Sequence, residues 1–234
     1  MTLQNAAKRF YAGAFNALHD TSSALGFGMA SYRQPQRLGD MAMIRRIKQQ
    51  RDMLLTPLEA VQLVYLVRAT AKLGGCMAEV GVYRGASARL MREGDKKRPF
   101  HLFDTFTGLP ETSQKDTAHR FGQFGKGQFA CGLEDVQHYL SDVPGLHFHP
   151  GLFPETGAEL SDEQFSFVHI DVDIYDSSIK SLEWFYGRML PGGIIVSHDF
   201  ASAAGPRAAF TEFFEHRPEP LIELPGDQCM IVKV

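Results

Sequence analysis

The stretch Glu79-Val-Gly-Val-Tyr-Arg-Gly-Ala-Ser87 decides the fold class of this 234-residue chain. It starts inside an apolar run that is typical of a buried strand and ends in a segment with helical spacing. Gly81 and Gly85 permit a tight turn and let a ligand approach the backbone, while the free N–H groups of the helix start suit an anion. A purely structural turn needs the same glycines, so this pattern alone identifies no ligand.

From Cys76 onward, short apolar runs alternate with helical segments, which indicates a parallel sheet with crossover helices. The clearest helical pattern covers residues 176–190 and is expected to stop at residues 191–193, Pro-Gly-Gly. The expected parallel strands are residues 77–82, 100–103, 146–149, 165–172 and 193–197.

The C-terminus departs from this alternation. Two β-like runs, residues 221–224 and 229–234, are joined by residues 225–228 alone. So short a link permits an antiparallel hairpin and excludes a helical crossover. The sequence therefore predicts an α/β, Rossmann-like fold with a mainly parallel sheet and a C-terminal antiparallel hairpin. This arrangement is typical of class I methyltransferases rather than of all-parallel dehydrogenases.

The pattern of the first 70 residues is mostly helical, and Thr56, followed by Glu59 three residues later, is a good helix start. We expect residues 1–70 to form an N-terminal helical extension that covers a site or contacts another subunit, and residues 71–234 to form the main domain. Residues 107–132 are rich in glycine and irregular. They are interpreted either as a lid or binding loop or as a disordered connector.

The composition, with 44% hydrophobic and 22% charged residues, is that of a globular protein. A net charge of −3 gives no basic footprint for a phosphate backbone, so nucleic acid is not expected as a partner. Three scattered cysteines do not form a disulfide framework, and no apolar run reaches the roughly 18 residues of a membrane span. We expect a cytoplasmic protein without a membrane partner.

An acidic residue further along the chain adds a second indication of a cofactor site. Asp104 ends the second expected strand about 20 residues after the glycine turn at Gly85, where a carboxylate can accept both hydroxyls of a ribose. For S-adenosylmethionine, the helix start and Ser87 would hold the amino acid carboxylate, and Glu79 would accept from the ammonium group. An NAD site has the same two features, so this pair leaves both cofactors open.

Two further strands run directly into polar side chains, Asp171 and Asp173 after one and His198 and Asp199 after the next. In open α/β sheets such strand ends border the ligand crevice. Carboxylates gathered there form a hard-ligand cluster suited to Mg²⁺. An equally simple interpretation is that Asp199 caps the following helix and His198 is an ordinary strand-end residue.

At these residues the chain resembles the macrocin O-methyltransferase family, whose members methylate sugars on antibiotics. The resemblance covers residues 70–234 and is carried by EVGVYRGASA, LFDTFTGLP, FVHIDVDIYDS and LPGGIIVSHDF, in the family's order. It implies methyl transfer from S-adenosylmethionine to a hydroxyl of a sugar or glycosylated small molecule in natural product or polysaccharide biosynthesis. It also implies that magnesium (Mg²⁺) or another divalent ion assists the reaction, and that the protein forms a homo-oligomer.

The resemblance also implies roles for single residues. Asp171 and Asp199 match metal ligands, and Asp173 matches a proposed base. His198 stands where the family usually has a second carboxylate, so we assign it to the metal or to proton transfer. The residues expected at the cofactor are Glu79, Gly81, Tyr83, Gly85, Ser87, Asp104, Thr105 and Asp171.

The implied reaction is an in-line attack of the acceptor hydroxyl on the sulfonium methyl group, with Asp173 or His198 taking the proton. A metal-dependent methyltransferase acting on a catechol or another phenol is a rival within the same class, and a polysaccharide or lipid-linked sugar is an alternative acceptor. An NAD-dependent oxidoreductase or a non-catalytic nucleotide-binding module are rivals from other classes. The oxidoreductase leaves the aspartate cluster and the terminal hairpin unexplained.

Overall fold

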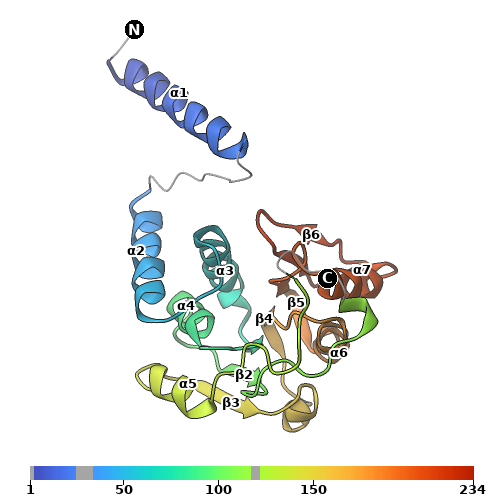
Figure 1. The fold of residues 1–234 in the computed structure, drawn as a ribbon. Coiled ribbons are helices and arrows are strands. Elements are labelled where there is room, and N and C mark those ends of the chain that lie inside the picture. Colours follow the sequence, from blue (N-terminus) through green and yellow to red (C-terminus); the bar gives the residue numbers. More distant parts are fainter. Residues whose placement is uncertain (1–2, 25–33, 117–121) are drawn as a thin grey trace. The chain divides into compact units, whose positions relative to one another are not determined.

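The computed structural model describes residues 3–24, 34–116 and 122–234, without the side chains of residues 3–11 (Figure 1). The chain divides into two compact units, residues 1–39 and 40–234. The first contains α1, Leu3–Ala24, and the described strands all belong to the second. The expected division into residues 1–70 and 71–234 stays a prediction.

Helix α2, Pro35–Gln50, is followed by α3, Pro57–Thr70, and a short 3₁₀ turn, η1, Ala71–Leu73. The predicted start of α3 is confirmed. Thr56 Oγ1 accepts a hydrogen bond from the Glu59 backbone N–H, and Glu59 Oε2 accepts one from the Thr56 backbone N–H. This capping box satisfies two donors that a helix start otherwise leaves unpaired.

Among the described residues the sheet has seven strands in the order β3-β2-β1-β4-β5-β7-β6, and all run in one direction except β7, which is antiparallel to both β5 and β6. The predicted mainly parallel sheet and its C-terminal hairpin are confirmed. The strands are β1 Cys76–Val80, β2 Phe100–Asp104, β3 Leu146–Pro150, β4 Phe165–Ile170, β5 Met189–Ser197, β6 Ile222–Glu223 and β7 Cys229–Val232.

Helices cover both faces of the sheet, with α3 and α4 on one side and α6 and α7 on the other (Figure 1). Aromatic side chains of β2, β4 and α6, among them Phe103, Phe165 and Phe185, are completely buried in the core between the sheet and α6. Burial of each such side chain stabilises the fold by about 1.5–3 kcal/mol. The remaining helices are α4 Ala86–Gly94, α5 Leu133–Tyr139, α6 Tyr175–Tyr186 and α7 Ala204–Phe214, with 3₁₀ turns η2 Gln114–Asp116 and η3 Glu155–Leu160.

The predicted boundary between α6 and β5 is wrong. The helix ends at Tyr186, and β5 begins at Met189, so the Pro-Gly-Gly sequence lies inside the strand rather than after a helix. The register of β5 against β4 shifts between the pairs Phe165↔Met189 and Phe167↔Ile194. This irregularity accommodates a proline and a positive-φ glycine that a regular ladder would exclude.

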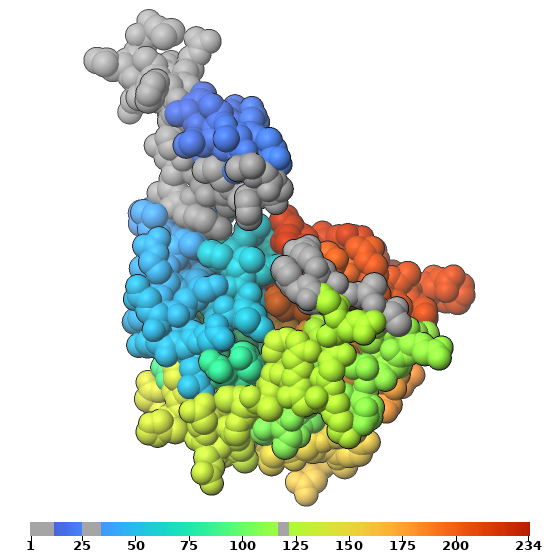
Figure 2. Space-filling view, viewed as in Figure 1, coloured from blue at the N-terminus to red at the C-terminus, as the bar shows by residue number. Residues whose placement is uncertain are grey.

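The described part of residues 107–132 folds back on itself. Leu109 N donates to Gln128 O and Gly127 N donates to Leu109 O, both at 2.8 Å. A Cβ at Gly108, where φ is +91°, would come within 2.4 Å of Gly127 O, so only glycine permits this approach. In Figure 2 the described atoms of this segment, coloured green to yellow-green, lie on the visible face of the second unit. The arrangement favours the binding-loop interpretation over a connector.

No helix among the described residues is long and apolar enough to cross a membrane. The three cysteines, Cys76, Cys131 and Cys229, are free thiols.

Candidate cofactor and acceptor site

A cavity of about 490 Å³ lies at the carboxyl ends of β1, β2, β4 and β5. The loops that follow these strands line it, together with the connection between α2 and α3, residues 108–110 and 128–129, and the turn between β6 and β7. Parallel strands bring their carboxyl ends to one edge of the sheet, and the reversal of strand order between β1 and β4 opens a crevice there.

The glycine turn after β1 is shaped by two different constraints. Gly81 has φ +89° and lines the cavity, and a Cβ there would lie 1.7 Å from Asp171 O. Gly85 has φ +79° and is the N-cap of α4, but a Cβ there would meet Leu140 and Val136 at 3.0 Å rather than the cavity. The expectation that Gly85 makes room for a ligand is therefore replaced by packing between α4 and α5.

Glu79 is completely buried at the end of β1. Its Oε1 lies 3.0 Å from Nδ1 of His169, a histidine whose pKa burial lowers to about 4. Burial raises the pKa of Glu79 well above its usual value, the Ser87 hydroxyl opposes this, and the nearby Asp104 carboxylate adds to it. Ser87 itself lines the cavity, so a cationic group placed beside it would favour the ionised form of Glu79.

Asp104, at the end of β2, is an acceptor for the backbone around it. Its Oδ2 accepts from Val82 N at 2.7 Å and Tyr83 N at 2.9 Å, and its Oδ1 accepts from Phe106 N at 2.7 Å. Thr105 Oγ1 donates to the backbone oxygen of the next turn, Gly108 O, at 2.7 Å. Both side chains line the cavity, and both also hold the loops that form it.

Asp171, His198 and Asp199 form a cluster in which one ligand atom from each residue lies within 4.8 Å of the others. His198 Nδ1 is 3.1 Å from Asp171 Oδ1 and 3.2 Å from Asp199 Oδ1. Burial opposes a charged His198, yet the two carboxylates outweigh it and raise the pKa of His198 well above its usual value. Burial likewise opposes ionisation of Asp199, but His198 and a backbone N–H bring its net pKa below the usual value.

Asp173 lines the same cavity, and its backbone adopts the left-handed conformation, with φ +62°. Its backbone N–H donates to Asp199 Oδ2 at 3.2 Å, which fixes the loop after β4 against the end of β5. Burial, and then the charges of Asp199 and Asp171, raise the pKa of Asp173 well above its usual value. Its ionised form is therefore a stronger proton acceptor than an ordinary aspartate.

The fold and this geometry can be compared with known proteins. The model of the macrocin O-methyltransferase family (TylF) matches residues 56–228, about three quarters of the chain. The chain belongs to this family. The predicted family is thereby confirmed, and α3 lies inside the match, although the resemblance seen in the sequence began only near residue 70.

Two curated relatives of this macrocin O-methyltransferase family member come from Streptomyces. It is 30% identical over 140 residues to the 8-demethyl-8-(2,3-dimethoxy-alpha-L-rhamnosyl)-tetracenomycin-C 4'-O-methyltransferase of Streptomyces olivaceus, covering 54% of this chain and 53% of the relative. It is 24% identical over 155 residues to the demethyldecarbamoylnovobiocin O-methyltransferase of Streptomyces niveus, covering 59% and 58%. The chain thus spans little more than half the length of these relatives.

A solved structure, that of the O-methyltransferase NovP, shares the fold with a TM-score of 0.66 at 19% sequence identity. The similarity covers 78% of this chain and 82% of NovP. It confirms the class I methyltransferase fold of this family member, including the antiparallel strand between β5 and β6.

In this family member the sequence did not reveal Glu59 as a site residue. It lines the cavity, and its Oε2 lies 3.7 Å from His198 Nε2. Burial opposes its ionisation, but the nearby His198 and the hydrogen bonds that Asp227 and Thr56 donate lower its pKa to about 2. The capping pattern marked Glu59 only as part of a helix start, because the sequence does not show where α3 docks.

The charge and polarity of the cavity were also not foreseen. Among the described lining residues, Arg84 and His198 are the basic side chains, and Arg84 is 3.6 Å from Asp52. Acidic side chains are more numerous: Asp52, Glu59, Asp104, Asp171, Asp173, Asp199 and Asp227. An apolar wall adjoins them, made of Met53, Leu54, Leu55, Leu109, Pro110, Phe129, Leu152 and Phe153.

Proposed function

We propose that this protein is an S-adenosylmethionine-dependent O-methyltransferase that acts on a hydroxyl of a sugar or glycosylated small molecule. The observation that carries the proposal is one cavity in which the glycine turn after β1 faces the Asp171, His198 and Asp199 cluster. Membership of the macrocin O-methyltransferase family and a curated relative that methylates a rhamnosyl group support it. A homo-oligomer, a cytoplasmic location and the lack of a nucleic acid partner stay predictions.

The donor would lie across the ends of β1 and β2. The free N–H groups at the start of α4 and the Ser87 hydroxyl would bind the carboxylate of the donor. The buried carboxylate of Glu79, which Ser87 contacts, would balance the charge of the donor's ammonium group. Gly81 leaves the backbone open to it, and Asp104 and Thr105 shape the ribose end. Tyr83 and Asp171, both predicted from the sequence, complete the proposed set, whereas Gly85 packs against Val136 and Leu140 and does not line the cavity.

Methyl transfer needs an acceptor hydroxyl aligned with the sulfonium carbon and a group that takes its proton. Asp173 is the proposed base, because it faces the cavity and burial raises the pKa of its carboxyl, which makes the ionised form a better proton acceptor than an ordinary aspartate. As the O–CH₃ bond forms and the S–CH₃ bond breaks, the hydroxyl proton moves to an Asp173 carboxylate oxygen. His198, next to Asp171 and Asp199, stabilises the negative charge that gathers around the acceptor oxygen.

Asp171, His198 and Asp199 also fit a divalent cation, since two carboxylate oxygens and one imidazole nitrogen converge within 4.8 Å. A bound cation would hold the acceptor hydroxyl and lower its pKa. Because one donor is nitrogen, the set suits Mn²⁺ or another transition ion at least as well as Mg²⁺. Metal assistance remains a proposal.

The first experiment measures binding of S-adenosylhomocysteine and NAD⁺ by calorimetry. Binding of S-adenosylhomocysteine alone supports the methyltransferase, and binding of NAD⁺ alone contradicts it. The second measures methyl transfer from S-adenosylmethionine to a panel of glycosides and catechols after treatment with EDTA, with Mg²⁺, Mn²⁺ or no metal added. Transfer to catechols but to no glycoside would contradict the proposed acceptor, and full activity without metal would contradict the metal role.

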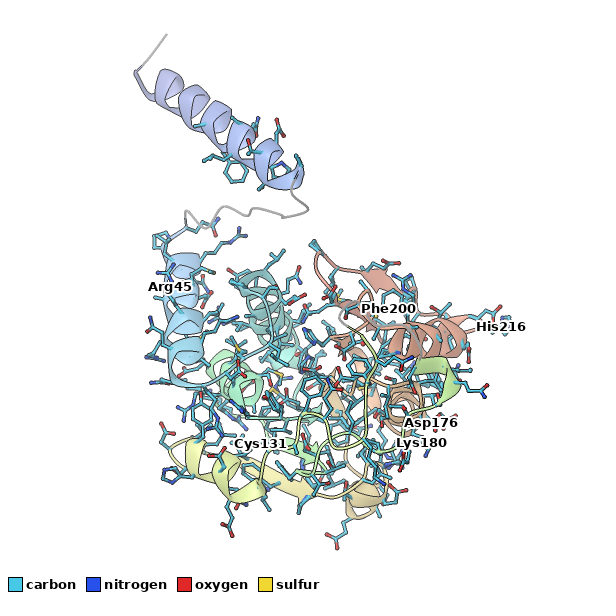
Figure 3. The ribbon with its side chains drawn as sticks, in the orientation of Figure 1. Arg45, Cys131, Asp176, Lys180, Phe200 and His216 are labelled. Atoms are coloured by element: carbon cyan, nitrogen blue, oxygen red, sulfur yellow. The ribbon has the colours of Figure 1, made fainter. Side chains whose placement is uncertain are left out.

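Asp173→Asn should lower kcat by about 10²–10⁴-fold, the usual contribution of a positioned base. Asp176→Asn is the matched control, because Asp176 is an exposed carboxylate on α6, three residues away and outside the cavity lining (Figure 3). Equal activity of the two variants would remove Asp173 from the chemistry.

A further inference from the structure

Glu59 is a buried carboxylate that joins three separate parts of the chain. Its Oε2 accepts from Thr56 N and Thr56 Oγ1, both at 2.8 Å, at the start of α3. Its Oε1 accepts from Asp227 N at 2.8 Å, in the turn between β6 and β7. The side chain is 2% exposed, so these contacts hold it in one place. Helix capping alone would not require the second contact, 168 residues away in the sequence.

The turn is fitted to this carboxylate. Gly226 has φ +98°, and a Cβ there would lie 2.5 Å from Glu59 Oε1. Gln62, one helical turn further along α3, donates to Pro225 O at 3.1 Å and to Gln228 Oε1 at 2.9 Å. The N-terminal part of α3 and the hairpin turn are thus joined at the rim of the cavity, with Glu59 pointing inward.

The third contact of Glu59 reaches the reaction centre. Its Oε2 lies 3.7 Å from His198 Nε2, while Nδ1 of the same ring lies 3.1 Å from Asp171 and 3.2 Å from Asp199. The imidazole therefore has a carboxylate on each side, and its orientation is set from both ends. At 2% and 12% exposure, Glu59 and His198 interact with little screening by water.

We propose that Glu59 is a positioning residue for His198, holding the imidazole so that Nδ1 faces Asp171 and Asp199. The inference rests on the proposed function and adds a part to it, since α3 and the terminal hairpin then help to set the reaction centre. Glu59 does not touch the acceptor or the methyl group. Its effect on turnover passes through His198 and disappears when residue 198 has no imidazole.

The test is a double-mutant cycle of Glu59→Gln and His198→Gln, two substitutions of similar size and shape. Glu59→Gln should lower kcat about tenfold, which corresponds to about 1.4 kcal/mol, with the KM for S-adenosylmethionine unchanged. In the His198→Gln background the same substitution should change kcat by less than about twofold, because the group through which it acts is gone. Equal losses in the two backgrounds would overturn the proposal.

Thr56→Ala is the control for helix capping, since it removes one hydroxyl from Glu59 but leaves the charge and the two backbone donors, Thr56 N and Asp227 N, that hold the carboxylate. It should lower the stability of α3 without changing kcat, and a tenfold loss of kcat in this variant would also overturn the proposal. A second readout needs no turnover: the ¹⁵N signals of the His198 ring should shift in Glu59→Gln and remain in place in Thr56→Ala. Absence of methyl transfer with the expected ring shifts would contradict the proposed function and support the positioning role.

Discussion

Replacement of Asp104 separates a structural role from a ligand role. The carboxylate accepts three backbone N–H groups, from Val82, Tyr83 and Phe106. Hydrogen bonds to a charged acceptor contribute about 1.5–3 kcal/mol each when buried, and partial exposure reduces this to about 1. Asp104→Ala should therefore lower the free energy of unfolding of the ligand-free protein by about 3 kcal/mol. Asp104→Asn, which keeps one acceptor oxygen for Val82 and Tyr83, should lower it by about 1 kcal/mol.

The assay is urea unfolding followed by circular dichroism, with the affinities for S-adenosylhomocysteine and for methionine measured in parallel. Disorder of the turn at Tyr83 should weaken both ligands in Asp104→Ala, because the turn borders the whole donor site. A role limited to the ribose predicts a different pattern. An alanine variant that unfolds within about 0.5 kcal/mol of the parent, binds methionine normally and has lost S-adenosylhomocysteine would refute the structural argument.

Gly81→Ala should destabilise the fold by more than about 3 kcal/mol, because its Cβ would lie 1.7 Å from a backbone oxygen. Gly85→Ala should destabilise it by only about 1–2 kcal/mol, because the atoms that its Cβ would meet belong to side chains. Urea unfolding compares the two variants, and equal losses of stability would contradict the geometry. Burial lowers the pKa of His101 to about 4 from an ordinary 6.5, so the folded protein holds this side chain neutral. The unfolded chain takes up a proton below pH 6.5, and the free energy of unfolding therefore falls as the pH falls from 6.5 towards 4, by about 3 kcal/mol in full. Unfolding at pH 7 and pH 5 should show this loss, and His101→Phe should reduce it; an unchanged slope in that variant would disprove the assignment. Gly226→Ala should lower both thermal stability and kcat, because its Cβ would displace the Glu59 carboxylate. If neither quantity falls, the turn can move away from Glu59 without cost and the prediction is wrong.

Much of the fold could be predicted because the relevant signals are local. The apolar runs of β1, β2, β3 and β4 alternate with helical segments, and the short link before β7 permits only a hairpin. The start of β5 was missed for an equally local reason: Met189 and Leu190 continue the helical spacing of α6, and Pro191 then reads as a helix stop. The register shift that places a proline inside a strand depends on the neighbouring β4 and leaves no mark in the sequence.

The candidate site was predictable where it depends on strand ends and unpredictable where it depends on docking. Asp171 and Asp199 were expected together because adjacent parallel strands end at one edge, and their atoms do converge. The amide contacts of Asp104 depend on the path of two loops, which spacing cannot give. Glu59 depends on where α3 lies against a strand end 139 positions later, so its proximity to His198 required the structure.

Under the proposed function, the acidic lining of the cavity would distinguish the methyl donor from the product that remains after transfer. The sulfonium centre of S-adenosylmethionine carries a positive charge, and the thioether of S-adenosylhomocysteine carries none. Ionised carboxylates in the lining, such as Asp104 and Asp171, would attract the first and would have no charge to attract in the second. Under the proposed function this attraction would end at the moment of reaction, which would favour departure of the demethylated donor and weaken product inhibition.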